Sequence, residues 1–196
     1  MADAIGMIEV EGVAGIIVGA DAAVKAASVE LAGWESIGGF TTLFIRGGTG
    51  DVDTAVQAGA EAARTVVDHV VTAQMHQPQP QTSEFVGFPV DPSAVGGAEV
   101  VGALGLVETR GYGTHVESND AMVKAADVQI ARVLTVHNRV VCTLVTGSVD
   151  DVEQALTEAR QLLGRSEWFL GAAVIQQPQP EVIAAFVQAQ TAAGAS

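Results

Sequence analysis

Residues 5–32 read IGMIEVEGVAGIIVGADAAVKAASVELA, and residues 104–131 read LGLVETRGYGTHVESNDAMVKAADVQIA. The two stretches agree along their whole length when they are aligned with an offset of 99 residues. Identical pairs include Gly6 and Gly105, Glu9 and Glu108, Gly12 and Gly111, Asp21 and Asp120, and Lys25 and Lys124. An agreement of this length indicates an internal repeat, which decides the organisation of the chain.

The repeat continues beyond these stretches with an offset of 100, as the pairs Gly47 with Gly147 and Asp51 with Asp151 illustrate. The run QPQP at residues 77–80 recurs at residues 177–180. The change of offset places a length difference of one residue between residues 33 and 46. The chain is therefore predicted to be a tandem duplication, with halves near residues 1–80 and 100–180.

Each half has the same predicted order of elements. In the first half, strands are expected at residues 5–10, 29–34, 41–45 and 69–75, and helices at 13–27 and 51–67. In the second half, the corresponding segments are residues 104–109, 112–126, 128–134, 140–145, 150–163 and 168–175. The order βαββαβ is the split βαβ arrangement. The predicted fold class is thus α/β (α+β), with two tandem ferredoxin-like domains in unpermuted order and antiparallel sheets.

We expect the first domain at residues 1–85, a linker at 86–102, the second domain at 103–188 and a disordered tail at 189–196. The linker assignment depends on Pro89, Pro92 and a pair of glycines, which are typical of connecting segments. Residues 181–196 are rich in alanine and glutamine, so they are expected to form one or two helical turns before fraying.

The composition limits the classes of protein that the chain can be. Its 196 residues carry 9 Lys+Arg and 23 Asp+Glu, a formal net charge of −14, which argues against binding to nucleic acid or to an anionic membrane. Charged residues interrupt every apolar run before the ~18 residues that a spanning helix needs. The start MADA lacks the basic residues of a secretory signal, and a single cysteine excludes an internal disulfide. We therefore expect a cytoplasmic location.

No catalytic or metal site can be assembled from the sequence. The histidines show no HxxxH or HExxH spacing, and His69, His76 and His115 are interpreted as scattered surface residues. Cys142 lies in a predicted strand, where a cysteine usually acts as a small buried apolar group. We therefore predict no metal, no cofactor and no enzymatic activity.

Two further motifs resemble parts of functional sites. Glu9 and Glu108 have no companion group for acid–base chemistry, so each is expected to accept backbone N–H bonds near a turn. The run RGGTG at residues 46–50 lacks the Lys-Ser/Thr of a phosphate-binding loop and is interpreted as a tight turn between a strand and a helix.

The pattern GMIE-x-x-G, followed by DA-x-VKAA-x-V, an IGG loop and a strand that ends in RG, resembles the shell proteins of bacterial microcompartments (BMC). Two copies in one chain resemble the tandem-domain class of that family. The resemblance covers nearly the whole chain apart from the linker and the tail. It implies a homotrimer that mimics a hexamer, forms a flat disc and tiles edge to edge into the shell with other shell proteins, of the hexameric single-domain and pentameric vertex types.

The resemblance also implies a pore at the centre of the disc, lined by the loop between the second and third strands. Small metabolites would cross the shell through it. The predicted pore-lining residues are Ser36, Ile37, Gly38, Gly39 and Phe40 in the first half and Thr135, Val136, His137, Asn138 and Arg139 in the second. The second loop departs from the glycine-rich sequence that is usual in the family.

This departure leads to a hypothesis about selectivity. The glycine loop would offer backbone N–H groups, and His137 and Arg139 would add positive charge to an otherwise acidic disc. A narrow, polar pore that admits small, anionic metabolites would result. The alternative is that Arg139 turns away from the pore and pairs with an acidic neighbour, as surface arginines usually do. The loop cysteine that holds an iron–sulfur cluster in some tandem shell proteins is absent from both loops.

The resemblance assigns an edge role to four residues. Lys25 and Lys124 match the lysine that packs against its symmetry mate in the neighbouring disc, although a solvated lysine on a helix face is the simpler interpretation. Gln79 and Gln179 stand where the family often has an arginine that helps this contact, which puts the strength of tiling in doubt.

A different class of function, a trimeric ferredoxin-like regulatory protein that binds a metabolite between subunits, is the alternative. It predicts a long ligand loop and basic phosphate-binding residues, which the sequence lacks.

Overall fold

The computed structural model describes residues 3–78, 102–136 and 140–187. The first half contains β1 (Ala4–Glu11), α1 (Ala14–Ala26), β2 (Val29–Ile37), β3 (Phe40–Gly47), α2 (Thr49–Ala63) and β4 (Val70–Met75). The second half contains β5 (Ala103–Arg110), α4 (Tyr112–Ala125), β6 (Gln129–Val136), β7 (Val140–Gly147), α5 (Val149–Leu163) and β8 (Phe169–Gln176). A short α6 (Pro180–Val182) and the helical turn η2 (Ile183–Val187) follow.

Each half forms one antiparallel sheet of four strands, in the order β2-β3-β1-β4 and β6-β7-β5-β8. The predicted order of elements and the predicted fold class are therefore confirmed. Most boundaries lie within two or three residues of the prediction, but α2 ends at Ala63, four residues earlier than expected.

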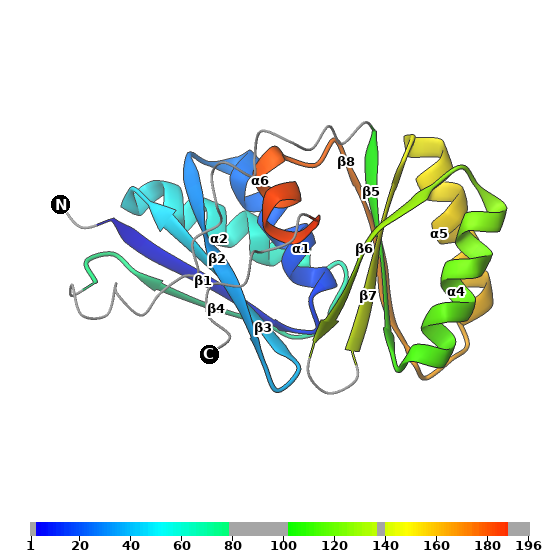
Figure 1. The fold of residues 1–196 in the computed structure, drawn as a ribbon. Helices are drawn as coiled ribbons and strands as arrows, with labels where there is room; N and C mark the ends of the chain where they lie inside the picture. Colours follow the sequence, from blue (N-terminus) through cyan, green and yellow to red (C-terminus); the bar gives the residue numbers. More distant parts are fainter. Residues whose placement is uncertain (1–2, 79–101, 137–139, 188–196) are drawn as a thin grey trace, which may run out of the picture.

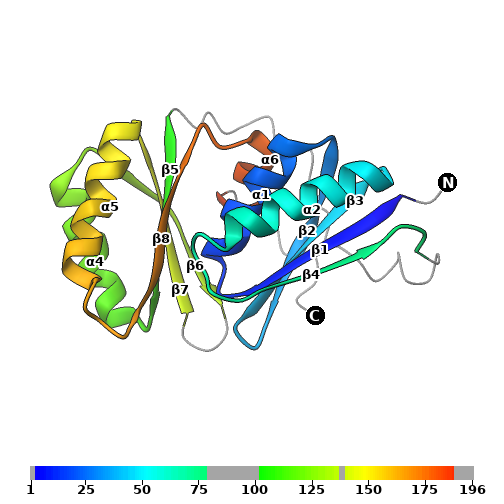
Figure 2. The ribbon, with the colours of Figure 1, turned by 180° about the vertical axis from the view of Figure 1, so that it is seen from behind.

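The elements stack in alternating layers: the first sheet, α1 with α2, the second sheet, and α4 with α5 (Figures 1 and 2). The sheet of the second half therefore covers α1 of the first half. A single apolar core runs through this contact, because Ile16 and Ile17 of α1 belong to the same buried cluster as Leu104, Leu106 and Leu144 of the second sheet. The two halves consequently form one packed body.

The two helices of the first half approach each other at a pair of glycines. A Cβ atom on Gly59 would lie 2.7 Å from the carbonyl oxygen of Gly19, so only glycine allows the two backbones to come this close. Ser118 and Ala159 occupy the corresponding positions of the second half. The α4–α5 pair is thus built from larger residues than the α1–α2 pair.

The end of the described chain packs back onto the first half. Phe186 of η2 is fully buried and stacks on Trp34 of β2, with ring centroids 5.5 Å apart. The Trp34 indole N–H donates to the carbonyl of Ala185 at 3.0 Å, and the Arg132 guanidinium of β6 donates to the carbonyl of Phe186 at 3.1 Å. This segment therefore joins both halves, as a helical turn of the kind expected after residue 180.

The connection between β2 and β3 is shorter than predicted. Residues 36–40 were expected to form a loop, but Ser36 and Ile37 end β2, Phe40 begins β3, and only Gly38 and Gly39 form the turn. Both glycines have positive φ, 61° and 93°, which suits the two-residue turn that connects twisted antiparallel strands. The strands can therefore continue to the tip of the hairpin.

Candidate functional site: the contact between the two halves

A buried carboxylate of the second half lies at the start of the first helix of the first half. Glu108 in β5 is 1% exposed, and its Oε1 atom accepts hydrogen bonds from the backbone N–H groups of Val13 at 2.7 Å and Ala14 at 3.2 Å. The N-cap residue of α1 is Val13, whose side chain has no oxygen to accept these bonds. Glu108 therefore caps α1 from the other half of the chain, where a negative charge also complements the helix dipole.

Burial and hydrogen bonding act in opposite directions on the pKa of Glu108. Burial disfavours the charged form and is the largest effect, whereas the N–H groups of Val13 and Ala14 favour it. The negative charge of Glu11 adds a smaller unfavourable contribution. The pKa of Glu108 rises from its ordinary value of 4.5 to about 7 as a result.

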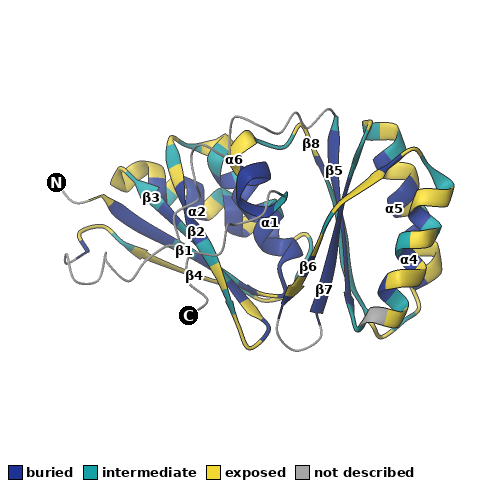
Figure 3. Ribbon diagram, viewed as in Figure 1, coloured by how far each residue is buried: buried dark blue, intermediate teal, exposed yellow. Residues whose placement is uncertain are grey.

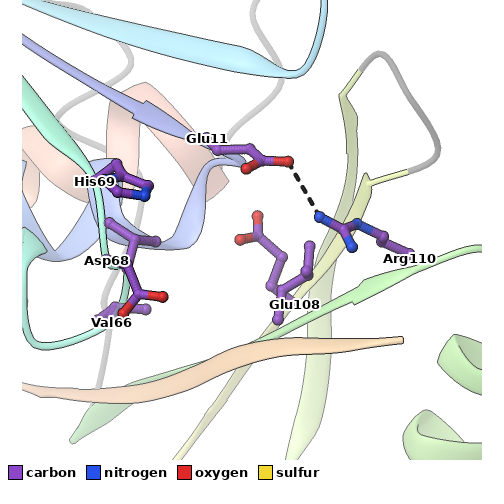
Figure 4. A pocket seen from close by; sticks show the side chains of 8 residues that line it. Glu11, Val66, Asp68, His69, Glu108 and Arg110 are labelled. Carbon is purple, nitrogen blue, oxygen red and sulfur yellow. Dashed lines mark hydrogen bonds and ion pairs between the residues drawn. The ribbon is translucent and has the colours of Figure 1, made fainter. Parts of the chain in front are cut away.

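An ion pair joins the two halves beside this cap. The Arg110 guanidinium at the end of β5 donates to Glu11 Oε1 at the end of β1 over 3.2 Å (Figure 4). The two residues occupy the same position of the repeat, 99 residues apart, and carry opposite charges. Both side chains are about half exposed, so the pair contributes more to the choice of partner than to stability.

A cavity of about 220 Å³ opens between the halves at this point. The polar side chains around it come from both halves and include those of Glu11, Asp68, His69, Glu108 and Arg110 (Figure 4). Within the described residues, no group of three or more His, Cys, Asp or Glu side chains could hold a metal ion.

Two of the predicted edge residues meet at a second contact between the halves. Asp21 of α1 forms an ion pair with Lys25 at 2.5 Å, and it accepts a hydrogen bond from the backbone N–H of Gln179 at 2.9 Å. Lys25 also donates to the carbonyl of Gln176 at 3.2 Å. In the second half, Lys124 pairs with the exposed Asp120. Gln79 lies outside the described residues, and the edge role of all four residues stays a prediction.

The predicted pore-lining residues that the structure describes lie at the β2–β3 turn and at the end of β6. In the first, Ile37 and Phe40 are 70% and 52% exposed, and in the second, Thr135 is exposed while Val136 is buried. The ends of both hairpins lie at the same end of the molecule in two opposite views (Figures 1 and 2). The structure thus brings the described parts of the two predicted segments to the same end of the molecule. His137, Asn138 and Arg139 lie outside the described residues.

The prediction that His115 is a surface residue is wrong. It is a residue of α4 and is 2% exposed, and its ring nitrogen lies 2.9 Å from the hydroxyl of Thr143 in β7 and 3.2 Å from the amide of Asn119. Burial lowers the pKa of His115. The corresponding position in α1 is the apolar Ile16. The second half therefore buries a network of polar side chains where the first half buries an apolar side chain.

The other two histidines and the cysteine follow the sequence interpretation more closely. His76 is exposed and contacts Asp53 at 2.8 Å, and His69 is exposed at the cavity between the halves. Cys142 is fully buried, which raises the pKa of its thiol well above the ordinary value. The prediction of a small buried group is confirmed for Cys142.

The prediction that Glu108 accepts backbone N–H bonds is confirmed, but the donors belong to the other half. Its counterpart Glu9 accepts a hydrogen bond from the Thr42 hydroxyl at 2.7 Å. The sequence analysis did not predict that Glu108, Glu11 and Arg110 form contacts between the two halves of the chain. The available signal was the pair Glu11 and Arg110, which carry opposite charges at one position of the repeat, two residues after the glutamates.

Among the described residues, no helix is both long and apolar enough to cross a bilayer.

A family model described as "BMC domain" matches the chain twice, at residues 4–75 and 103–178. The "Carboxysome assembly protein CcmO" of Synechococcus elongatus is 29% identical over 197 residues, which span 97% of this chain and 71% of that protein. The protein of the same name from Synechocystis is 31% identical over 81% of this chain and 56% of its own length.

The "Carboxysome shell protein CsoS1" of Prochlorococcus marinus is 47% identical over 76 residues, 38% of this chain and 74% of that protein. A crystal structure of a microcompartment protein from Desulfitobacterium hafniense covers 91% of this chain and 97% of its own, with 24% identity and a TM-score of 0.40. Because the BMC domain matches both halves, the chain belongs to the family of bacterial microcompartment shell proteins and carries two BMC domains in tandem.

Proposed function

We propose that the protein is a structural building block of a microcompartment shell in the bacterial cytoplasm. Three chains would close into a pseudohexameric ring, and the rings would tile into the shell facet with hexameric and pentameric shell proteins. The proposal depends on one observation: the two halves are copies of one domain, but they contact each other through different faces. The sheet of the second half covers α1 of the first half. A contact between unlike faces of like domains generates rings or filaments when it is repeated.

The names of the relatives support the same proposal. The matched proteins are called carboxysome assembly and carboxysome shell proteins, which points to a structural role rather than to catalysis. We accordingly propose that the chain has no enzymatic activity and that it acts without a cofactor. Its net charge of −14 is unfavourable for partners such as nucleic acid or anionic membranes.

We further propose that the two hairpin tips line a central pore for small polar metabolites. Three turns of Gly38 and Gly39 would alternate with three loops that contain His137, Asn138 and Arg139. The positive charge of Arg139 in an acidic disc would favour the entry of small anions.

Electron microscopy of the concentrated, purified protein tests the structural role. We expect sheets or tubes with a repeat of one ring. Discrete particles that never associate, and whose melting temperature depends on a metabolite, would contradict a shell role and favour a regulatory protein.

Permeability tests the pore. Shells assembled around an enzyme with an anionic substrate should turn that substrate over more slowly when they carry Arg139→Glu than when they carry the natural protein. Arg165→Glu is the matched control, because Arg165 is exposed in the turn after α5 and the change of charge is the same. Equal rates for Arg139→Glu and the natural protein would contradict a role for Arg139 in the pore.

A further inference from the structure

The cavity of about 220 Å³ between the two halves has the features of a small-molecule site, and a structural role in a shell does not require it. We propose that this cavity binds a small organic cation, a primary ammonium on a short hydrocarbon group, with the ammonium at the carboxylate of Glu108. All the residues that would hold this ligand belong to a single chain, so binding does not depend on how chains associate.

The inner end of the cavity is a buried carboxylate with one unused oxygen. Glu108 is 1% exposed, and the hydrogen bonds from the N–H groups of Val13 and Ala14 both go to its Oε1 atom. Among the described residues, no group donates a hydrogen bond to its Oε2 atom. A buried ionised oxygen without a donor is unfavourable. A ligand that brings an N–H donor to Oε2 would remove this cost.

The charges around the cavity favour a cation. The Glu108 carboxyl points into the space between Glu11, Asp68 and Arg110 (Figure 4). Arg110 already forms an ion pair with Glu11, whereas Asp68 forms none among the described residues. The carboxylates of Asp68 and Glu108 therefore remain uncompensated. They would repel an anion and attract a positively charged group.

The rest of the lining favours an organic cation over an inorganic one. Three apolar side chains, those of Val66, Val67 and Leu170, line the cavity and pack against the apolar core of the chain. The hydrocarbon part of an organic ammonium would cover them, whereas the water around a hydrated metal ion would not. The described residues also contain no group of three or more His, Cys, Asp or Glu side chains that could hold a metal. Apolar walls with a few converging polar groups are typical of sites for small molecules.

The proposed site spans the contact between the halves. Glu108 and Leu170 belong to the second half, whereas Asp68, Val66 and Val67 belong to the first. A cation bound here would lie between two carboxylates that come from different halves. Because the cavity exists only in the folded chain, the ligand should also raise the melting temperature.

Binding of an ammonium should depend on pH, because it requires the ionised form of Glu108. Burial raises the pKa of Glu108 to about 7. At that pKa, the ionised fraction increases from about one tenth at pH 6 to about nine tenths at pH 8, so we expect affinity to increase about tenfold. The other charged or titratable side chains near Glu108 are those of Glu11 on β1, Asp68 and His69 before β4, Arg110 on β5 and Cys142 on β7.

Isothermal titration calorimetry of the full-length protein with propylammonium chloride at pH 8 tests the proposal. We expect saturable binding of one cation per chain in the millimolar range. The neutral isostere n-propanol and the anion propionate should not bind, and sodium or magnesium chloride at equal concentration should not displace propylammonium. Equal binding of n-propanol or propionate, or displacement by either salt, would overturn the proposal.

Two variants test the carboxylates. Glu108→Gln keeps an acceptor for the helix N–H groups but loses the charge, so it should weaken binding about tenfold or more. Asp68→Asn changes an exposed site, where folding is not at stake, and should weaken binding about twofold to fivefold. The matched control is Asp127→Asn, an exposed aspartate after α4 and outside the cavity, which should bind as the natural protein does.

The pH dependence separates Glu108 from the histidine at the cavity. The increase in affinity from pH 6 to pH 8 should persist in His69→Gln and disappear in Glu108→Gln. Natural affinity in both Glu108→Gln and Asp68→Asn, or an increase with pH that survives in Glu108→Gln, would overturn the proposal.

Discussion

At the scale of single residues, the informative group is the Glu108 carboxyl. It lies among charged and titratable groups from several elements: Glu11 on β1, Asp68 and His69 before β4, and Arg110 on its own strand. The buried thiol of Cys142 on β7 is electrostatically coupled to it. Burial nevertheless dominates, and the pKa of about 7 places its titration in the physiological range.

A first prediction concerns the pH dependence of stability. The pKa of Glu108 is higher in the folded chain than its ordinary value of 4.5, so the folded chain binds the proton more tightly. The contribution of Glu108 to the free energy of unfolding is therefore full below pH 4.5 and falls as the pH rises to about 7. The loss amounts to about 3 kcal/mol at most, at 1.36 kcal/mol for each unit of pKa.

Urea unfolding of the natural protein and of Glu108→Gln at pH 5, 6, 7 and 8 measures this effect. Glutamine keeps an acceptor for the N–H groups of Val13 and Ala14 but does not ionise. We expect the natural protein to lose stability relative to Glu108→Gln as the pH rises. A constant difference between the two proteins across this range would show that Glu108 does not titrate as described.

The sequence predicted the type of role for Glu108 but not its partner. A glutamate in mid-strand with no companion group is correctly interpreted as an acceptor of backbone N–H bonds. The donors, however, lie 94 and 95 residues away in the chain, and no local pattern connects them. His115 was misplaced for a related reason, since its burial depends on the polar partners Asn119 and Thr143 rather than on its own polarity.

At the scale of the elements, the repeat encodes one fold with two kinds of core. The α1–α2 pair is close-packed at Gly19 and Gly59, whereas α4 rests partly on the network of His115, Asn119 and Thr143. Periodicity predicted the helices and strands of both halves well. It could not predict the extra length of β2 and β3, because Gly38 and Gly39 were read as part of a longer loop.

A second prediction follows from the glycine contact. In Gly59→Ala, the added Cβ would lie 2.6 Å from Cδ1 of Ile8 and 2.7 Å from the carbonyl oxygen of Gly19. Overpacking of this kind costs about 1–3 kcal/mol. Gly50 lies in the same helix with nothing within 4 Å of its Cβ position, so Gly50→Ala should be neutral or stabilising. Urea unfolding compares the two variants, and an equal effect of both would contradict the close contact.

At the scale of the whole molecule, one chain already contains one of the two contacts that a ring of domains requires. The sequence predicted two domains, and the resemblance implied a ring. Neither could predict which face of one half covers the other, because the repeat makes the two halves nearly equivalent. The asymmetry becomes visible only in the burial of α1 and the exposure of α4 (Figure 3).

A cryo-electron microscopy reconstruction of the assembled natural protein tests this account most directly. The account predicts a ring of three chains in which the first sheet of each chain covers α4 of the next. A ring in which the start of α4 faces solvent, or in which like halves meet, would contradict it.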